Sequence, residues 1–219
     1  MDVVIFGSTG MLGAGVLREC LLDPGIERVV AVVRRPTGQQ HPKLREIVRA
    51  DVTDLGPVVD ELTGLDACFF TLGASAAGMT EDRYTAVTYD LTTAVARQLA
   101  EWNPAMTFIY VSGTGTDSTE HGRVMWARVK GRTENALLAM PFRAAYMFRP
   151  GWVQPSHGER SATRWYRVAY ALAGWLFPLL KAAAPNSATT TEQFARAMIR
   201  VAREGYARPV LEMRDIVSL

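Results

Sequence analysis

Gly7-Ser8-Thr9-Gly10-Met11-Leu12-Gly13, near the start of the chain, spaces three glycines three residues apart. The short apolar run Asp2–Phe6 precedes it and suits a buried first strand. The segment Met11–Leu22 begins within it and has apolar residues at helical spacing. A glycine-rich turn between a strand and a helix directs backbone N–H groups and the positive end of the helix at a phosphate. The pattern predicts dinucleotide binding, with an ordinary β–α turn as the alternative.

Each glycine has a physical role in such a turn. Gly7 permits the tight turn, Gly10 lets the backbone approach a pyrophosphate, and Gly13 allows close packing of helix on strand. We expect all seven residues of the motif to form the cofactor site: Gly7, Ser8, Thr9, Gly10, Met11, Leu12 and Gly13. The G-x-x-G-x-x-G spacing resembles the short-chain dehydrogenase/reductase superfamily, especially its extended and atypical branches.

Strand and helix patterns alternate along the first 150 residues. This order predicts an α/β fold, a doubly wound parallel sheet of the NAD(P)-binding Rossmann type. Strands are expected at Asp2–Phe6, Arg28–Val33, Leu44–Arg49, Ala67–Leu72, Met106–Ser112 and Ala144–Arg149. Helices are expected at Met11–Leu22, in a short segment ending at Leu62, at Asp82–Trp102 and at Gly122–Met140.

The last third of the chain changes character after Pro150. We expect residues 151–205 to form a small helical substrate lobe within a single domain spanning residues 1–219. Five aromatic residues favour this lobe: Trp165, Tyr166, Tyr170, Trp175 and Phe177. Tyr166–Leu180 fits a lid or a dimer contact, with a lipid-surface helix as the alternative. A helix over Thr191–Arg203, capped by a threonine, and an edge strand over Val210–Leu219 complete the expectation.

Composition sets further bounds. The chain has 219 residues, 48% of them hydrophobic, and a net charge of +2, which gives no case for nucleic-acid binding. Cys20 and Cys68 are expected as buried free thiols, and the three histidines are too isolated for a metal site. The apolar stretch Val168–Leu180 is too short to span a membrane, and the first strand leaves no room for a signal peptide. We therefore expect a cytoplasmic protein without an integral membrane segment.

The residues after the second strand indicate which nicotinamide nucleotide is bound. Arg34 and Arg35 stand where an acidic residue would bind the ribose of NAD, and a guanidinium suits the extra phosphate of NADP. NADP(H) is therefore the preferred cofactor, with NAD(H) or a merely solvated turn as alternatives. By resemblance, Asp51 and Val52 would hold the adenine, although Thr53 or Asp54 capping a helix is also expected there. Three residues that close the fourth strand belong to the same crevice: Thr71, Leu72 and Gly73.

The residues expected to carry out the chemical step differ from those of the superfamily that the chain resembles. That family works with a serine and with a tyrosine four residues before a lysine. Lys130 fits the lysine that holds the nicotinamide ribose, but Trp126 stands at the tyrosine position. An indole is a donor only and cannot act as a general acid or base, although it can wall a pocket. Ser112 would polarise the substrate oxygen. The proton would come from water, a cofactor hydroxyl or His121. Tyr84, at the start of the long helix, and Tyr110, inside the fifth strand, are expected to be structural residues.

Two further segments extend the resemblance across nearly the whole chain. Residues 125–134 look like the active-site helix of atypical short-chain dehydrogenases related to the Tat-interacting-protein family, and Phe148-Arg149-Pro150-Gly151 matches the segment after the sixth strand there. Thr189-Thr190-Thr191 looks like bacterial epimerase-like proteins. The resemblance implies an NADP-dependent oxidoreductase or epimerase for a small carbonyl or alcohol, with Pro150 at the cofactor and a homodimer as the expected assembly. The alternative is a non-catalytic NADP(H)-binding redox sensor or scaffold.

Overall fold

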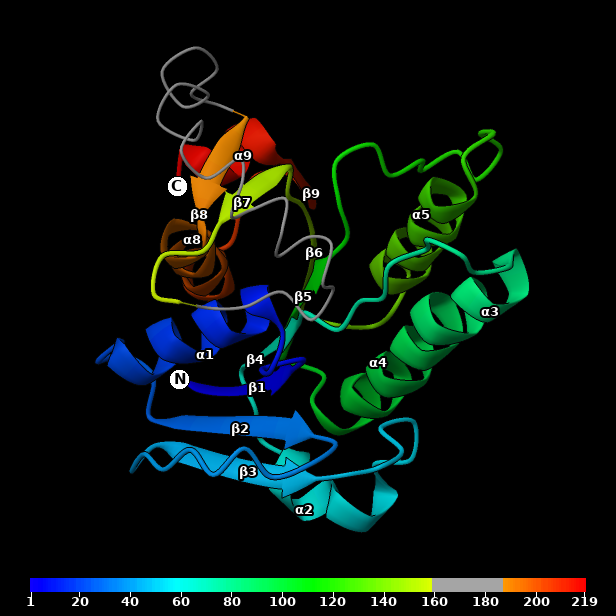
Figure 1. Cartoon of the computed structure of the whole chain (residues 1–219). Helices are drawn as coiled ribbons and strands as arrows, with labels where there is room; N and C mark the ends of the chain where they lie inside the picture. Colours follow the sequence, from blue (N-terminus) through cyan, green and yellow to red (C-terminus); the bar gives the residue numbers. More distant parts are fainter. Residues whose placement is uncertain (159–186) are drawn as a thin grey trace.

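A computed structural model describes residues 1–158 and 187–219. Its centre is a parallel sheet of seven strands in the order β3-β2-β1-β4-β5-β6-β9 (Figure 1). The strands are β1 (Asp2–Phe6), β2 (Arg28–Val33), β3 (Leu44–Val48), β4 (Ala67–Phe70), β5 (Thr107–Val111), β6 (Ala144–Arg149) and β9 (Val210–Glu212). The order reverses direction between β1 and β4, where a doubly wound sheet opens its binding crevice. The predicted α/β Rossmann-type fold is confirmed.

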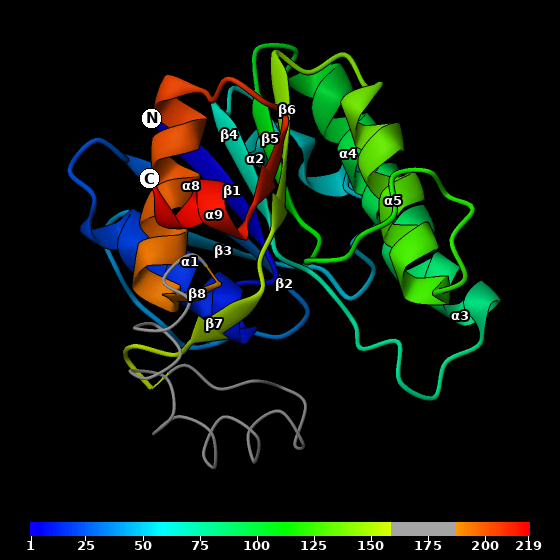
Figure 2. The same ribbon diagram turned by 90° about the horizontal axis from the view of Figure 1, so that it is seen from above.

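Helices cover both faces of this sheet (Figures 1 and 2). One face carries α1 (Met11–Leu22) and α8 (Thr191–Glu204), and the other carries α4 (Leu91–Trp102) and α5 (Met125–Leu138). The remaining helices are short: α2 (Val59–Leu62) after the 3-10 turn η1 (Gly56–Val58), α3 (Glu81–Thr85), and α9 (Met213–Val217).

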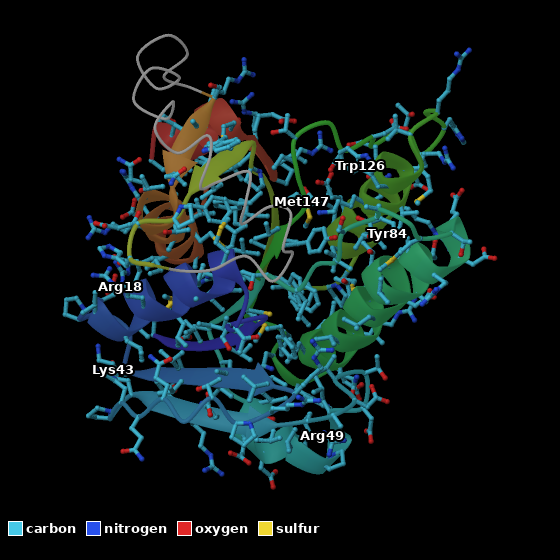
Figure 3. The ribbon with its side chains drawn as sticks, viewed as in Figure 1. Arg18, Lys43, Arg49, Tyr84, Trp126 and Met147 are labelled. Carbon is cyan, nitrogen blue, oxygen red and sulfur yellow. The ribbon has the colours of Figure 1, made fainter. Side chains whose placement is uncertain are left out.

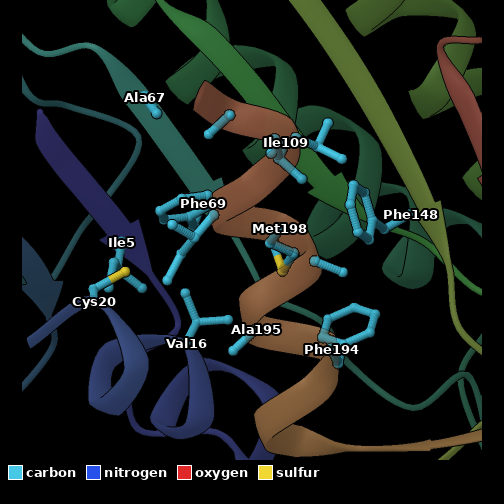
Figure 4. Packing of buried hydrophobic residues seen from close by; sticks show 14 of the residues in the cluster. Ile5, Val16, Cys20, Ala67, Phe69, Ile109, Phe148, Phe194, Ala195 and Met198 are labelled. Atoms are coloured by element: carbon cyan, nitrogen blue, oxygen red, sulfur yellow. The ribbon is translucent and has the colours of Figure 1, made fainter. Parts of the chain in front are cut away.

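The alternation of side chains along each strand explains the two layers. Val3 and Ile5 of β1 pack with α1 and α8, whereas Val4 and Phe6 pack on the opposite face. Figure 4 shows the first of these clusters, in which Phe69 of the sheet faces helix α8. Cys20 and Cys68 are free and buried, as predicted.

Several expected elements begin or end one to three residues earlier or later than predicted, and two elements and one expected cap differ more. The single helix expected over Asp82–Trp102 is α3, a π-helical segment η2 (Ala86–Asp90) and α4 in succession. The edge strand expected over Val210–Leu219 ends at Glu212, because Glu212 and Asp215 form a capping box that starts α9. Thr53 and Asp54 do not cap a helix, since η1 begins after Leu55 without a side-chain cap.

The segment assigned to the substrate lobe is described only in part. β7 (Trp152–Gln154) and β8 (Ala188–Thr190) form a separate parallel pair, and Thr190 caps α8 by accepting from the Gln193 amide at 3.2 Å. Because α8 packs against α1, this part of the lobe belongs to the layered core. The aromatic stretch Tyr166–Leu180 lies outside the described residues. In the described ranges, no helix is both long and apolar enough to cross a membrane.

Candidate active site

The glycine-rich turn joins β1 to α1 in a conformation that only glycine tolerates well. Gly7 has a φ of +90°, and a Cβ there would lie 2.8 Å from the backbone of Thr71 and Leu72. A Cβ on Gly13 would lie 2.0 Å from the Gly7 carbonyl oxygen. The Thr71 hydroxyl packs beneath this turn and donates to the Phe6 carbonyl oxygen at 2.8 Å. The tight turn and the close helix packing expected of Gly7 and Gly13 are therefore present, and Thr71 supports the turn from below.

The start of α1 is open to an anion. The helix begins at Met11 after Gly10, and no side chain caps it. The Ser8 hydroxyl is buried and has no hydrogen-bond partner among the described residues. A buried hydroxyl without a partner costs free energy, which a ligand oxygen at this position would recover. These features fit a pyrophosphate. The side chains of Met11 and Leu12 are half-buried and pack against the core, so these two residues would offer a ligand their backbone at the start of α1.

Two connected cavities extend from this turn. A cavity of about 260 Å³ is lined by Gly7, Thr9, Val32, Val33, Arg34, Val52, Leu72, Gly73, Ala74, Val87 and Leu91. A more open one of about 530 Å³ is lined by Thr9, Arg34, Arg35 and Ala50. Thr9 and Arg34 line both. The first cavity is mainly apolar, which suits an adenosine, and the second carries two guanidinium groups, which suit a phosphate.

Of the other residues expected around the adenine, some line the first cavity and Asp51 does not. Val52, Leu72 and Gly73 line the first cavity. Asp51 is exposed, and its carboxylate accepts hydrogen bonds from the Thr53 hydroxyl at 2.6 Å and the Thr53 amide at 2.8 Å. These bonds lower the pKa of Asp51. In this structure its carboxylate organises the turn after β3 and does not line the cavity.

A third cavity of about 390 Å³ surrounds Lys130. It is lined by Ala74, Ser75, Ala76, Ala77, Tyr84, Trp126 and Lys130. Figure 3 labels Tyr84 and Trp126, which come from the neighbouring helices α3 and α5. Ala74 lines both this cavity and the first one, so the space beside Lys130 adjoins the crevice at the ends of the strands.

The Lys130 ammonium is partly withdrawn from water. Its Nζ donates a hydrogen bond to the Ser112 carbonyl oxygen. Burial lowers the pKa of Lys130 to about 8, and the nearby Glu134 carboxylate opposes that shift. A Cβ on Gly113 would stand 3.9 Å from this Nζ, with no closer contact. Lys130 therefore lies beside an open space with a pKa below that of an ordinary lysine.

A buried polar network lies behind the lysine. The Ser112 hydroxyl donates to Glu134 Oε1 at 2.5 Å, and Glu134 Oε2 pairs with Arg149 at 2.5 Å. Arg149 also contacts Glu212 at 2.9 Å and the Ser118 hydroxyl at 2.5 Å. The expectation that the Ser112 hydroxyl polarises a substrate oxygen does not match this geometry, because the hydroxyl proton is directed at a buried carboxylate.

The remaining candidates lie away from Lys130. His121 is exposed in the loop before α5 and is not among the residues that line the lysine cavity. Tyr110 is buried in the core, as expected, and burial raises its pKa. The Pro150 carbonyl accepts from the Thr114 amide at 3.0 Å, which ties the loop after β6 to the loop after β5. Within the described ranges, no three His, Cys, Asp or Glu side chains are grouped to hold a metal.

Several site residues have no clear pattern in the sequence. Val87, Leu91 and the loop Ala74–Ala77 line the cavities, and only Gly73 and Gly78 beside that loop mark it as unusual. The Glu134–Arg149 pair joins a helix to a strand 15 residues later, a distance that no helical or strand periodicity predicts.

Comparisons with known proteins agree with this geometry. Residues 7–146 match the model of a family described as NAD(P)H-binding. The protein fmp52-2, mitochondrial, of Aspergillus oryzae is 27% identical over 98% of this chain and 95% of its own length. The protein fmp52, mitochondrial, of Emericella nidulans is 27% identical over 74% of this chain and 70% of its own. These names contradict the expectation of a cytoplasmic location, which is wrong. The reported relatives are fungal, and they bear out neither the Tat-interacting family nor a bacterial origin.

Solved structures of similar fold are nucleotide-binding proteins. MoeE5 in complex with UDP-glucuronic acid and NAD has a TM-score of 0.68 and 18% identity, over 97% of this chain and 76% of its own. Bordetella bronchiseptica WbmH in complex with NAD+ has a TM-score of 0.66 and 18% identity, over 96% of this chain and 74% of its own. A short-chain dehydrogenase/reductase superfamily protein from Agrobacterium tumefaciens with bound NAD has a TM-score of 0.68 and 14% identity, over 97% and 77%. At these identities the likeness concerns the fold. With residues 7–146 matched, more than half of its length, this chain belongs to the NAD(P)H-binding family.

Proposed function

We propose that the protein is an NADP(H)-dependent oxidoreductase or epimerase for a small carbonyl or alcohol substrate. The observation that carries this proposal is that Ala74 lines both the cavity of Lys130 and the cofactor crevice, so that the two cavities are adjacent. A substrate beside Lys130 would therefore lie next to a bound nicotinamide. The cavity is lined by three alanines, Ser75, two aromatic rings and one cation, which suits a compact carbonyl compound with a largely apolar body.

The preference for NADP(H) rests on Arg34 and Arg35. Both are exposed at the end of β2, both line the open cavity beside Thr9, and the described residues that line that cavity include no carboxylate. Guanidinium groups bind a ribose phosphate through charge-assisted hydrogen bonds, whereas NAD offers only a hydroxyl there. The similar solved structures carry NAD, so the preference is a proposal about this chain alone.

The chain's own residues would divide the remaining work. When bound, the nicotinamide would accept or supply a hydride. The open start of α1 and Ser8 would hold the pyrophosphate, and Lys130 would hold the nicotinamide ribose. Trp126 would close the cavity beside the ring as an apolar wall.

A second reading is supported by the same site. Trp126 cannot exchange a proton near neutral pH, and the Ser112 hydroxyl is bonded to Glu134. Two of the three side chains that perform the chemistry in the resembled superfamily are thus changed or occupied. A redox sensor or scaffold would bind NADP(H) at this site without turnover.

Calorimetric titration of the purified protein with NADPH, NADP⁺, NADH and NAD⁺ tests the cofactor proposal. We expect NADPH to bind more tightly than NADH. Arg34→Ala with Arg35→Ala should weaken NADPH binding by about tenfold or more and leave NADH binding unchanged, because the phosphate contact is lost alone. Arg45→Ala, an exposed arginine on β3, is the control. If the double variant binds NADPH as tightly as the wild type, Arg34 and Arg35 do not bind the ribose phosphate. If the wild type binds none of the four dinucleotides, both the enzyme and the sensor or scaffold proposals are rejected.

Three expectations remain proposals. They are a link to the Tat-interacting-protein family, a homodimer that binds a small-molecule substrate, and a helical substrate lobe over residues 151–205. The described part of this last range contains the short parallel pair β7–β8 and helix α8.

A further inference from the structure

The lysine cavity contains a phenol that does not come from the helix of Lys130. Tyr84 lies on α3, and it is the one tyrosine among the described residues that line this cavity. Sequence spacing gives Tyr84 no relation to Lys130, because 46 positions separate them. The tertiary structure nevertheless brings both side chains, together with Trp126, to one cavity of about 390 Å³.

The position of Tyr84 is well determined by its helix. Thr80 caps α3, and its hydroxyl accepts from the Arg83 amide at 3.5 Å. α3 packs against α5, and the Arg128–Glu81 ion pair at 2.6 Å joins the two helices. Tyr84 is only 2% exposed, so its ring is held between these helices with little freedom to move. A rigid, nearly dry phenol is well placed for proton transfer within a closed site.

The surroundings of Tyr84 connect it to other polar groups. A negative charge on Tyr84 would raise the pKa of Tyr110, which places the two phenols near one another at the end of β5. Thr133 of α5 hydrogen-bonds to Tyr110. The titratable groups near Tyr84 and Lys130 are therefore Glu134 on α5 and Tyr110 on β5. The ion pair between Arg128 and Glu81 lies on the same two helices, α5 and α3.

We propose that Tyr84 supplies the proton-transferring phenol that α5 lacks at position 126, and that it works as a pair with Lys130. This inference rests on the proposed function. In the reduction, the Tyr84 hydroxyl would give its proton to the carbonyl oxygen as the C=O π bond breaks, and the new C–H bond would take the hydride that a bound reduced nicotinamide supplies. The phenolate regains a proton from Lys130, and Lys130 regains it from water. One proton is consumed for each hydride, and the product is an alcohol.

The first test needs no substrate. Protein labelled with ¹³C at tyrosine Cζ is titrated between pH 7 and 10 by NMR, and Tyr84→Phe identifies the Tyr84 resonance. We expect this resonance to move with a midpoint near that of Lys130, about 8, because the phenol senses the charge of the amine. The movement should vanish in Lys130→Met. The pairing of Tyr84 with Lys130 is overturned if the chemical shift of the Tyr84 resonance does not change through pH 8. It is also overturned if that shift changes by the same amount in Lys130→Met.

The second test measures turnover. NADPH oxidation is followed with benzaldehyde as the carbonyl probe, in the wild type, Tyr84→Phe and the control Tyr89→Phe. Tyr89 lies five residues later, with its ring under Arg132, and the substitution keeps that ring. We expect Tyr84→Phe to lower kcat about a hundredfold or more and to leave NADPH affinity unchanged, while Tyr89→Phe behaves as the wild type. Trp126→Tyr in the Tyr84→Phe background should restore part of the rate.

The two tests separate the failures. A wild type that binds NADPH and reduces no probe counts against the proposed reaction, and the NMR titration then still decides whether Tyr84 and Lys130 are paired. Full activity in Tyr84→Phe overturns the role of Tyr84 and leaves the proposed reaction in place.

Discussion

Replacing Arg149 by methionine tests the buried network behind Lys130. Arg149 on β6 pairs with Glu134 of α5 at 2.5 Å, where the Glu134 side chain is 1% exposed and that of Arg149 is 11% exposed. Methionine keeps much of the arginine stem and removes all of its donors. Glu134 would then lose its paired guanidinium and keep the Ser112 hydroxyl and the nearby Lys130 ammonium as charge-stabilising partners.

The structure sets the size of the effect. Removing one member of a buried ion pair leaves an uncompensated charge and costs about 3–5 kcal/mol. For a protein of this length, that loss corresponds to a fall in Tm of roughly 6–20 °C. The exposed pair of Arg45 and Glu61, at 2.7 Å, provides the matched control, because an exposed pair contributes about 0–1 kcal/mol. Arg45→Met should therefore leave the free energy of unfolding almost unchanged.

Urea denaturation followed by circular dichroism measures both variants. Combining Arg149→Met with Glu134→Gln should recover most of the loss, since the stranded charge is gone. The reasoning fails if Arg149→Met costs less than about 1 kcal/mol, or if the double variant is no more stable than Arg149→Met alone.

Two further predictions concern the cofactor turn and the lysine. Gly13→Ala should destabilise the protein by about 1–3 kcal/mol or more, because its methyl would meet the Gly7 carbonyl at 2.0 Å. A Cβ on Gly10 would lie 3.4 Å from the same oxygen, so Gly10→Ala should leave Tm unchanged in thermal unfolding but weaken NADPH binding in calorimetry. Unchanged NADPH affinity would contradict a close approach of the pyrophosphate to Gly10. Glu134→Gln should lower the pKa of Lys130 below about 8, because the carboxylate that favours the charged amine is removed. NMR of the ¹³C-dimethylated lysine gives this midpoint, and an unchanged value would exclude Glu134 as its electrostatic neighbour.

Local patterns predicted much of the fold. The bounds of Asp2–Phe6, Met11–Leu22, Arg28–Val33 and Ala144–Arg149 agree with the structure residue by residue. The three strands among them are unbroken apolar runs and the helix has apolar residues at helical spacing, so each can be recognised within its own segment. The prediction failed where a capping contact interrupts a run, as at Glu212, where the strand stops and a helix begins.

The residues of the candidate site likewise fall into those that local sequence predicts and those that only tertiary contacts bring together. The sequence by itself determined the strand–turn–helix unit and the glycines it needs, because neighbouring residues impose those constraints. Only the tertiary structure decided that Glu134 pairs with Arg149, that Tyr84 shares a cavity with Lys130, and that Gly131 must lack a side chain, since a Cβ there would lie 1.8 Å from the Asp117 carbonyl oxygen. Each of these contacts joins separate elements. Such a contact depends on how the helices pack against the sheet and against one another, and the spacing of residues along the chain does not predict that packing.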